Sequence, residues 1–252
     1  MKKLFIALAL TSSLFSCKKE TTNNNSTNGV TCVDNPSINF TAVGTPVGKF
    51  SDCIKDLDGN TYKTVVIGTQ TWMAENLKVS KYNDSTTIPN ITDNTQWSNL
   101  TTGVWSYYNN DATNNAKYGK LYNWYAVNKT TNGNKNVCPK GWHVPIDSEW
   151  TVLTDYLGGE SLAGGKLKEV GTTNWNSPNA DATNASLFTG LPGGFRGSSG
   201  YYYFISDYGY WWSSSEYHTS NAWFRGLYNS NGDAGRNNGS KESGLSVRCL
   251  KD

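Results

Sequence analysis

The chain alternates between short apolar or aromatic runs and polar turns rich in Gly, Asn and Ser. Runs of β-branched and aromatic residues bounded by such turns are typical of β-strands. YKTVVI at 62–67 follows the turn signal Asp58-Gly59-Asn60, and a second run follows at 70–73. The last third of the chain repeats this pattern and predicts strands at 187–191, 201–205, 209–213, 222–227 and 245–250.

Three other segments have the apolar spacing of short helices. The most regular is 145–157, where Asp147 can cap the first turn, Trp150 and Leu153 share one face, and Gly158 follows the last turn. Shorter helices are predicted at 120–128 and 161–170. A few short helices followed by a late cluster of antiparallel strands predict an α+β fold.

The N-terminus has the pattern of an export signal. Lys2 and Lys3 precede an apolar run at 4–10 that is too short to span about 30 Å of hydrocarbon. Residues 14–17 (LFSC) resemble the lipobox of bacterial lipoproteins, which predicts a signal peptide at 1–16 and lipidation of Cys17. The polar run at 17–29 then reads as a tether. The alternative is an ordinary signal peptide with a coincidental cysteine.

The charge balance argues against nucleic acid as a partner. The whole chain has 22 Lys and Arg against 20 Asp and Glu. Removal of residues 1–16 takes away Lys2 and Lys3, so the mature chain is neutral and lacks a basic stripe. The expected partner is a membrane, reached through the lipid anchor, in the envelope of the cell. We expect an outer-membrane lipoprotein, with the cell surface as one orientation.

Cysteine usage fits an exported protein. Besides Cys17 the chain has four cysteines, an even number that suggests two disulfides. Of the three pairings we favour Cys32–Cys53, which staples a short segment at 30–53, and Cys138–Cys249. Four buried thiols are the alternative. No metal or other cofactor is expected, because there is no CxxC motif and the two histidines lie far apart. The oxygen-rich runs 109–111 and 229–233 are interpreted as Asx turns.

Aromatic residues make up 13% of the chain and crowd into its last third. Tyr and Trp rings with a polar edge suit binding surfaces, including those for sugars. Because side chains alternate between the faces of a strand, about half of these rings should be buried. We expect Phe195, Trp212 and Trp223 in the core. The candidate ligand-binding residues are Tyr201, Tyr202, Tyr203, Tyr208, Tyr217 and Tyr228.

Three arginines lie among apolar neighbours, and a buried arginine needs a partner. We expect Arg196, Arg225 and Arg248 to form an internal network with carboxylates, chiefly Glu149, with Glu75 and Glu216 as further candidates. His143 is interpreted as structural and His218 as solvated. There is no G-x-S-x-G nucleophile motif, so no catalytic residue is assigned.

Four motifs together are distinctive. They are QTWMAENL at 70–77, YGKLYNW at 118–124, CPKGWHVPIDSEW at 138–150 and SVRCLKD at 246–252. In this order they resemble the Fibrobacter succinogenes major paralogous domain family, over about residues 54–252, with Ile146 as a departure from its pattern. The resemblance implies an exported, often lipid-anchored protein.

The same family is similar, more distantly, to C-type lectin-like and formylglycine-generating-enzyme domains. Gly194-Phe195-Arg196-Gly197 and Val247-Arg248-Cys249 are similar to Gly-Phe-Arg elements of the latter. That similarity implies an irregular lectin-like domain whose N- and C-terminal strands lie close together, an arrangement that a Cys138–Cys249 bridge would suit. The expected function is a non-catalytic binding or adhesion module for a glycan or protein. The alternatives are a formylglycine-generating-type enzyme and a purely structural envelope component.

Overall fold

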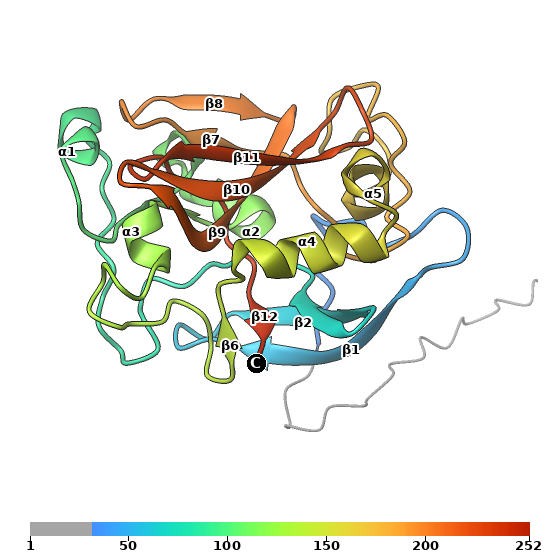
Figure 1. Cartoon of the computed structure of the whole chain (residues 1–252), viewed down its shortest axis with the longest axis horizontal. Helices are drawn as coiled ribbons and strands as arrows, with labels where there is room; N and C mark the ends of the chain where they lie inside the picture. The colour runs from blue at the N-terminus through green and yellow to red at the C-terminus, as the bar shows by residue number, and fades with distance from the viewer. Residues whose placement is uncertain (1–31) are drawn as a thin grey trace, which may run out of the picture.

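The computed structural model describes residues 32–252, which fold around two five-stranded sheets and a small two-stranded one (Figure 1). The expected signal peptide, the lipidation site Cys17 and the tether at 17–29 lie outside the described residues. No helix within residues 32–252 combines the length and apolar character that crossing a bilayer requires. The mixture of short helices and a late cluster of strands confirms the α+β prediction.

The first sheet brings the two ends of the domain together. Its strand order is β1-β2-β3-β12-β6. The tight β1–β2 turn forms because the Asp56 carboxylate accepts hydrogen bonds from the backbone of Asp58 and Asn60. The strands predicted at 62–67 and 70–73 are confirmed. The strands are β1 (Gly48–Lys55), β2 (Thr61–Ile67), β3 (Gln70–Met73), β6 (Trp142–His143) and β12 (Leu250–Lys251).

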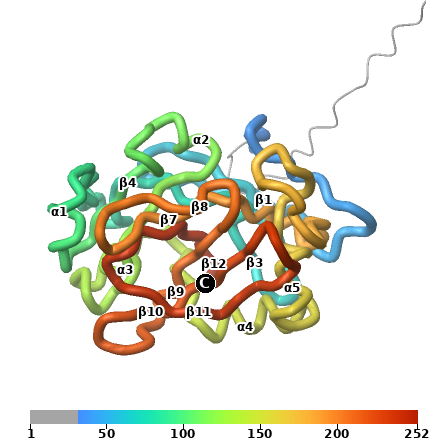
Figure 2. Tube along the Cα trace, turned by 90° about the horizontal axis from the view of Figure 1, so that it is seen from above, coloured from blue at the N-terminus to red at the C-terminus, as the bar shows by residue number. Residues whose placement is uncertain are grey.

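The second sheet is built from the last third of the chain, in the order β11-β10-β9-β7-β8. Figure 2 shows its orange and red strands lying over the rest of the domain. Three of its strands were predicted and two were not. The strands are β7 (Gly193–Arg196), β8 (Tyr202–Ile205), β9 (Tyr208–His218), β10 (Asn221–Tyr228) and β11 (Ala234–Ser240).

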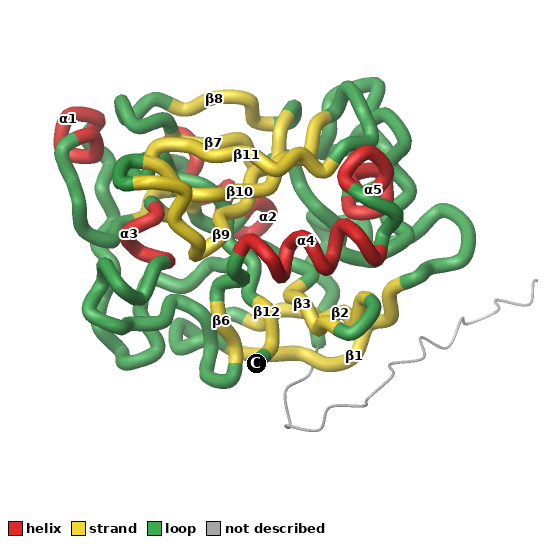
Figure 3. Tube along the Cα trace, viewed as in Figure 1, coloured by secondary structure: helices red, strands yellow, loops and turns green. Residues whose placement is uncertain are grey.

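Short helices and loops fill the space around the sheets (Figure 3). The helix predicted at 120–128 is wrong in part, because β5 and α3 divide that segment. A small sheet pairs β4 (Trp105–Ser106) with β5 (Leu121–Tyr122). The helices are α1 (Asn94–Ser98), α2 (Asn115–Tyr118), α3 (Trp124–Val127), α4 (Asp147–Tyr156) and α5 (Glu160–Leu167), with 3₁₀ turns at Tyr108–Asn110 and Ala112–Asn114.

Helix α4 lies between the two large sheets (Figure 1) and joins them through aromatic packing. Trp150 of α4 lies 4.7 Å, centroid to centroid, from Trp72 of β3 and 6.0 Å from Phe188. Phe188 in turn contacts Trp211 of β9 at 5.9 Å. These buried rings belong to one hydrophobic cluster, which links both large sheets.

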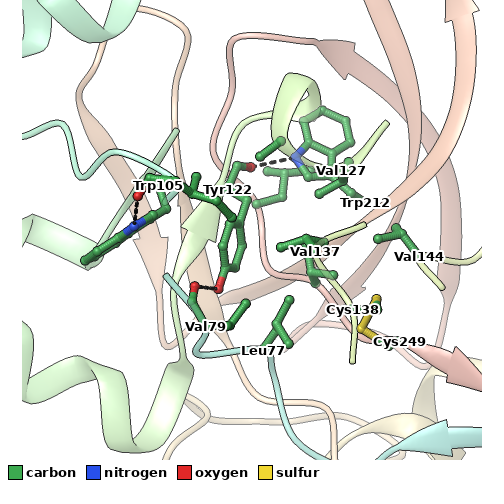
Figure 4. Close-up of a cluster of buried hydrophobic side chains, with 14 of the residues drawn as sticks. Leu77, Val79, Trp105, Tyr122, Val127, Val137, Cys138, Val144, Trp212 and Cys249 are labelled. Atoms are coloured by element: carbon green, nitrogen blue, oxygen red, sulfur yellow. Dashed lines mark hydrogen bonds between the residues drawn. A yellow bond between two sulfur atoms is a disulfide. The ribbon is translucent and has the colours of Figure 1, made fainter. Parts of the chain in front are cut away.

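A second part of the core surrounds Tyr122 (Figure 4). Its buried polar edges are satisfied: the Tyr122 hydroxyl donates to Val79 at 2.6 Å, and the Trp212 indole donates to the Tyr122 carbonyl at 2.8 Å. Cys138 and Cys249 form a buried disulfide in the same cluster, and Cys32 pairs with Cys53. Both pairings are the ones favoured from the sequence.

Two predicted strands are wrong or shortened. Residues 187–191 form no strand because Leu187 and Thr189 adopt left-handed backbone angles, with φ of 58° and 56°. Of the strand predicted at 245–250, only Leu250 belongs to β12, while Leu245 and Ser246 make isolated bridges to Tyr122 and Trp211. Strand β1 runs across residue 53, so the stapled segment at 30–53 contributes to the first sheet.

Candidate functional site

Strand alternation separates the rings of the second sheet into two sets. Trp211 of β9 points into the core, so its neighbours Tyr208 and Tyr210 lie on the other face. In β10, Tyr228 pairs with Tyr208 and Gly226 with Tyr210, which places Tyr228 and Phe224 on that face too. Trp212, which pairs with Phe224, follows on the same face of β9 but is fully buried, in the same hydrophobic cluster as Trp124.

These side chains form one continuous network of rings, which we call the aromatic face. Centroid distances between neighbours run from 4.6 Å for Phe204–Tyr208 to 6.2 Å for Tyr203–Phe204 and Tyr210–Tyr228. Tyr203 is 40% exposed and Phe204 47%, and the remaining rings are half-buried. The aromatic face consists of Phe195, Tyr203, Phe204, Tyr208, Tyr210, Phe224 and Tyr228.

Glycines beneath the rings explain how some of them lie. A Cβ atom placed on Gly226 would lie 2.6 Å from the Tyr228 hydroxyl oxygen, and one on Gly235 would lie 2.8 Å from the same atom. Tyr228 therefore lies along the sheet, over two positions that have no side chain. Phe224 covers Gly239 in the same way, at 3.1 Å. Tyr208 stands at 81° to Tyr228, so the face combines lying and upright rings.

Phe204 holds an exposed position in a strained backbone. Its φ is 60° and that of Ser206 is 68°, in the left-handed region that costs a residue other than glycine about 1–3 kcal/mol. The Phe204 ring is stacked on Phe195, at an interplanar angle of 22°, and lies 4.6 Å from Tyr208. Ring contacts thus offset the strain, and the most exposed residue of the aromatic face contacts three of its other rings.

The polar groups of the aromatic face are neutral. Asn237 donates a hydrogen bond to the Tyr228 hydroxyl at 2.8 Å. Burial raises the pKa of Tyr210, and it also raises that of Tyr228 against the lowering effect of the Asn237 bond. Both hydroxyls therefore stay protonated well above neutral pH. Within residues 32–252, every contact of a Lys or Arg cation with a ring falls on a ring outside the aromatic face.

The structure divides the six tyrosines that were candidates for ligand binding. Tyr203, Tyr208 and Tyr228 belong to the aromatic face. Tyr201, which is 60% exposed, is outside the ring network. The other two are engaged elsewhere. Tyr202 donates to Asn110 at 2.7 Å on the opposite face of β8, and Tyr217 packs on Trp223 at 4.6 Å.

Four members of the aromatic face were missed or misplaced. Phe195 was expected in the core, but it is half-buried because it faces outward with Tyr203. Trp223, which was also expected in the core, is only half-buried. Its ring packs against the guanidinium of Arg236, whose Cζ lies 3.6 Å from the ring centre. The alternation of Tyr208 with Trp211 could have assigned Tyr210 to the face. Phe204 and Phe224 require the strand register, which the sequence does not give.

The expected arginine–glutamate network is wrong in its chief partner, Glu149. Glu149 accepts hydrogen bonds from the Ile146 backbone at 2.8 Å and lies 3.0 Å from His143 Nε2. His143 Nδ1 lies 2.7 Å from Asp252, which fits the structural interpretation of this histidine. Glu149 therefore fixes the start of α4 and positions His143, and its carboxylate is bonded to neither Arg196, Arg225 nor Arg248.

Asp147 takes the role assigned to Glu149. Arg225 donates to one of its carboxylate oxygens at 2.7 Å and Arg236 to the other at 2.7 Å. The predicted capping role of Asp147 is wrong: Ile146 occupies the N-cap position, and Asp147 is the first helical residue of α4. Burial raises the pKa of Asp147, but the hydrogen bonds from Arg236 and Arg225 outweigh burial and hold it below the ordinary 3.8.

The other two arginines bind backbone carbonyls. Arg196 donates to Gly200 at 2.8 Å and to Thr92 at 3.1 Å, with its guanidinium 4.2 Å from the centre of the Trp97 ring. Arg248 donates to Thr189 at 2.8 Å, and its burial lowers its pKa to about 9. These carbonyls are free to accept because their loops are irregular.

Polar groups at three other candidate sites, a cavity and two oxygen-rich turns, are already hydrogen-bonded within the protein. A cavity of about 140 Å³ is lined by Cys138, Lys55, Lys140 and Asp56, among others, and the Asp56 carboxylate already accepts from Asn60. Asp111 accepts from the Thr113 backbone, and Asn231 from Asp233, which confirms the Asx-turn interpretation of both runs. Within residues 32–252 no three metal-binding side chains cluster. His218 is exposed.

Comparison with known proteins identifies the domain. Comparisons with curated proteins and with solved structures gave no match. A comparison with protein families matches residues 65–251, which is most of the chain, to the Fibrobacter succinogenes major domain. The match contains the Trp72 and Cys138 motifs and ends within the closing strand, as the sequence resemblance implies. The chain belongs to the Fibrobacter succinogenes major domain family.

Proposed function

We propose that this protein is a lipid-anchored module of the cell envelope whose lectin-like domain binds a glycan on the aromatic face. The observation that carries the proposal is the group of seven neighbouring rings on one side of the second sheet. Sugars present C–H groups on the faces of their rings, and aromatic side chains bury such surfaces while their polar edges bind hydroxyls. The alternative ligand for the same aromatic face is a protein.

The lipid anchor is proposed from the sequence, through the signal at 1–16 and the acylation of Cys17. It places the domain at the outer membrane, tethered through residues 17–29. Metabolic labelling with an alkyne fatty acid tests it, since a Cys17→Ser chain should lose the label that the unaltered chain carries. Labelling of both chains would contradict the anchor.

The disulfides support binding over the enzymatic alternative. Oxidation of the formylglycine-generating type needs thiolates, and the four cysteines within the described residues are paired. Thiol counting under denaturing conditions tests this choice. Four blocked cysteines are expected in the Cys17→Ser chain. A reduced pair that binds copper would favour the enzyme.

Glycan-array binding tests the proposed function. The full chain with Cys17→Ser should bind glycans, and Phe204→Ala with Tyr208→Ala should weaken binding at least tenfold by removing ring surface. Phe204→Tyr with Tyr208→Phe should retain binding, because the rings remain. Tyr201→Ala is the matched control, since Tyr201 is exposed but outside the aromatic face. Absence of glycan binding by the parent chain would contradict the proposal and favour the structural alternative.

A further inference from the structure

We infer that the aromatic face selects uncharged glycans whose sugar rings carry equatorial substituents, an inference that rests on the proposed function. The first ground is the shape of the face. Tyr228 lies along the sheet over Gly226 and Gly235, while Tyr208 and Tyr210 stand at 81° and 76° to it. Such a corner of flat and upright rings accepts a flat ring with C–H groups on its faces. An axial hydroxyl would instead place a polar group against a ring without a partner.

The second ground is charge. Of the described Lys and Arg side chains, those that contact a ring contact one outside the aromatic face. Lys168 is the cation bonded to this face, through the Tyr228 carbonyl at 2.8 Å, but it is fully buried and also donates to the Ala180 and Asn231 carbonyls, so an anionic sugar on the surface cannot pair with it. Carboxylates lie at one end of the face instead. The Asp207 carboxylate accepts a hydrogen bond from Asn229, the residue after Tyr228, at 3.3 Å. Asp233 lies in the turn between β10 and β11, and its charge adds to burial in raising the pKa of Tyr228. A carboxylate or phosphate on the ligand would lose water and meet like charge.

The third ground is the kind of hydrogen bonding available. The Tyr228 hydroxyl accepts from Asn237 and keeps its own proton for donation. The Asn237 side chain still has its amide oxygen as an acceptor. These neutral donors and acceptors match the hydroxyl groups of a neutral sugar and supply no charge-assisted bond to an anion.

Calorimetric titration of the full Cys17→Ser chain tests the inference with three probes. They are laminarihexaose, which is neutral and equatorial; mannohexaose, which is neutral but has an axial hydroxyl; and a hexamer of β-1,4-linked glucuronate, which is equatorial but anionic. We expect laminarihexaose to bind at least tenfold more tightly than either of the others at low salt. Asp207→Asn with Asp233→Asn should bring the affinity for the glucuronate hexamer closer to that for laminarihexaose and leave the laminarihexaose affinity unchanged.

The outcomes separate this inference from the proposed function. Binding of the glucuronate hexamer or of mannohexaose as tight as that of laminarihexaose would overturn the selectivity and leave glycan binding standing. Failure of all three probes, together with an empty glycan array, would overturn both. A gap that the two Asp→Asn substitutions do not change would overturn the charge argument.

Discussion

At the scale of the residue, the domain depends on buried charges that loops and helix ends satisfy. Asp147 is the clearest case, because it accepts from two arginines of neighbouring strands and begins the helix that joins the sheets. Arg225 is almost fully buried. Removing its partner would leave a buried charge unpaired, which is more costly than the pair itself is favourable.

We predict that Asp147→Asn lowers the free energy of unfolding by about 3 kcal/mol at neutral pH, measured by urea denaturation. Asp155→Asn, on the exposed side of the same helix, should change it by less than about 0.5 kcal/mol. Equal effects of the two substitutions would contradict the role of the Arg225 pair.

The same pair predicts a pH dependence. The folded-state pKa of Asp147 lies below its unfolded value, so the stabilisation is fully present above about pH 4 and is lost as the pH falls through the folded pKa. The stability difference between the parent and Asp147→Asn should therefore shrink below about pH 4. A difference that stays constant down to pH 2 would show that Asp147 acts by packing alone.

At the scale of the element, glycines decide what the second sheet presents to solvent. Strand β11 (AGRNNGS) pairs with β10 in continuous register from Ala234 to Ser240, although it has no β-branched or aromatic residue. Two of its residues contribute by having no side chain, since Gly235 and Gly239 leave room for Tyr228 and Phe224 to lie along the sheet.

We predict that Gly235→Ala abolishes glycan binding as completely as Tyr228→Ala, because the new methyl group forces the Tyr228 ring away from the sheet. The fold should remain, since Gly235 is not in the left-handed region and alanine is tolerated in a strand. Near-UV circular dichroism and calorimetric titration measure the two effects. Asn238→Ala, exposed on the same strand, is the control. Unchanged glycan binding by Gly235→Ala would contradict the role of the Tyr228 ring that lies along the sheet.

The sequence predicts strands where their own residues favour them and fails where neighbours decide. YKTVVI at 62–67 is β-rich and was predicted correctly, whereas β11 was not predicted, because its pairing with β10 supplies what its own residues lack. The same limit applies to the site. Alternation places some rings outward, but only register brings Phe195 and Phe224 beside Tyr210. The carbonyl groups that accept from Arg248 belong to a loop with left-handed residues, a conformation that the sequence pattern does not predict.

At the scale of the whole molecule, the Cys138–Cys249 disulfide ties the middle of the chain to its closing strand. It spans 111 residues, against 21 for Cys32–Cys53. Because a longer loop gains more entropy when it is opened in the unfolded chain, the longer link should stabilise the fold more. It also lies in the core next to β6 and β12, where it links the segments that lead into these two paired strands of the first sheet.

We predict that Cys138→Ala with Cys249→Ala lowers the free energy of unfolding by about 4–5 kcal/mol, and Cys32→Ala with Cys53→Ala by about 3 kcal/mol. Chemical denaturation of the two double variants measures the difference. A larger loss from the Cys32–Cys53 pair would contradict the closing role of the longer disulfide.

The proposed function requires that the ligand binds on the faces of the exposed rings. Nuclear magnetic resonance of the Cys17→Ser chain titrated with laminarihexaose measures this contact, because a proton above an aromatic ring shifts upfield. Binding on the ring faces predicts upfield shifts of the axial C–H protons of the sugar and perturbation of the Tyr203, Phe204 and Tyr228 ring signals. Sugar protons that do not shift, or perturbation confined to Tyr201 and Tyr217, would contradict it.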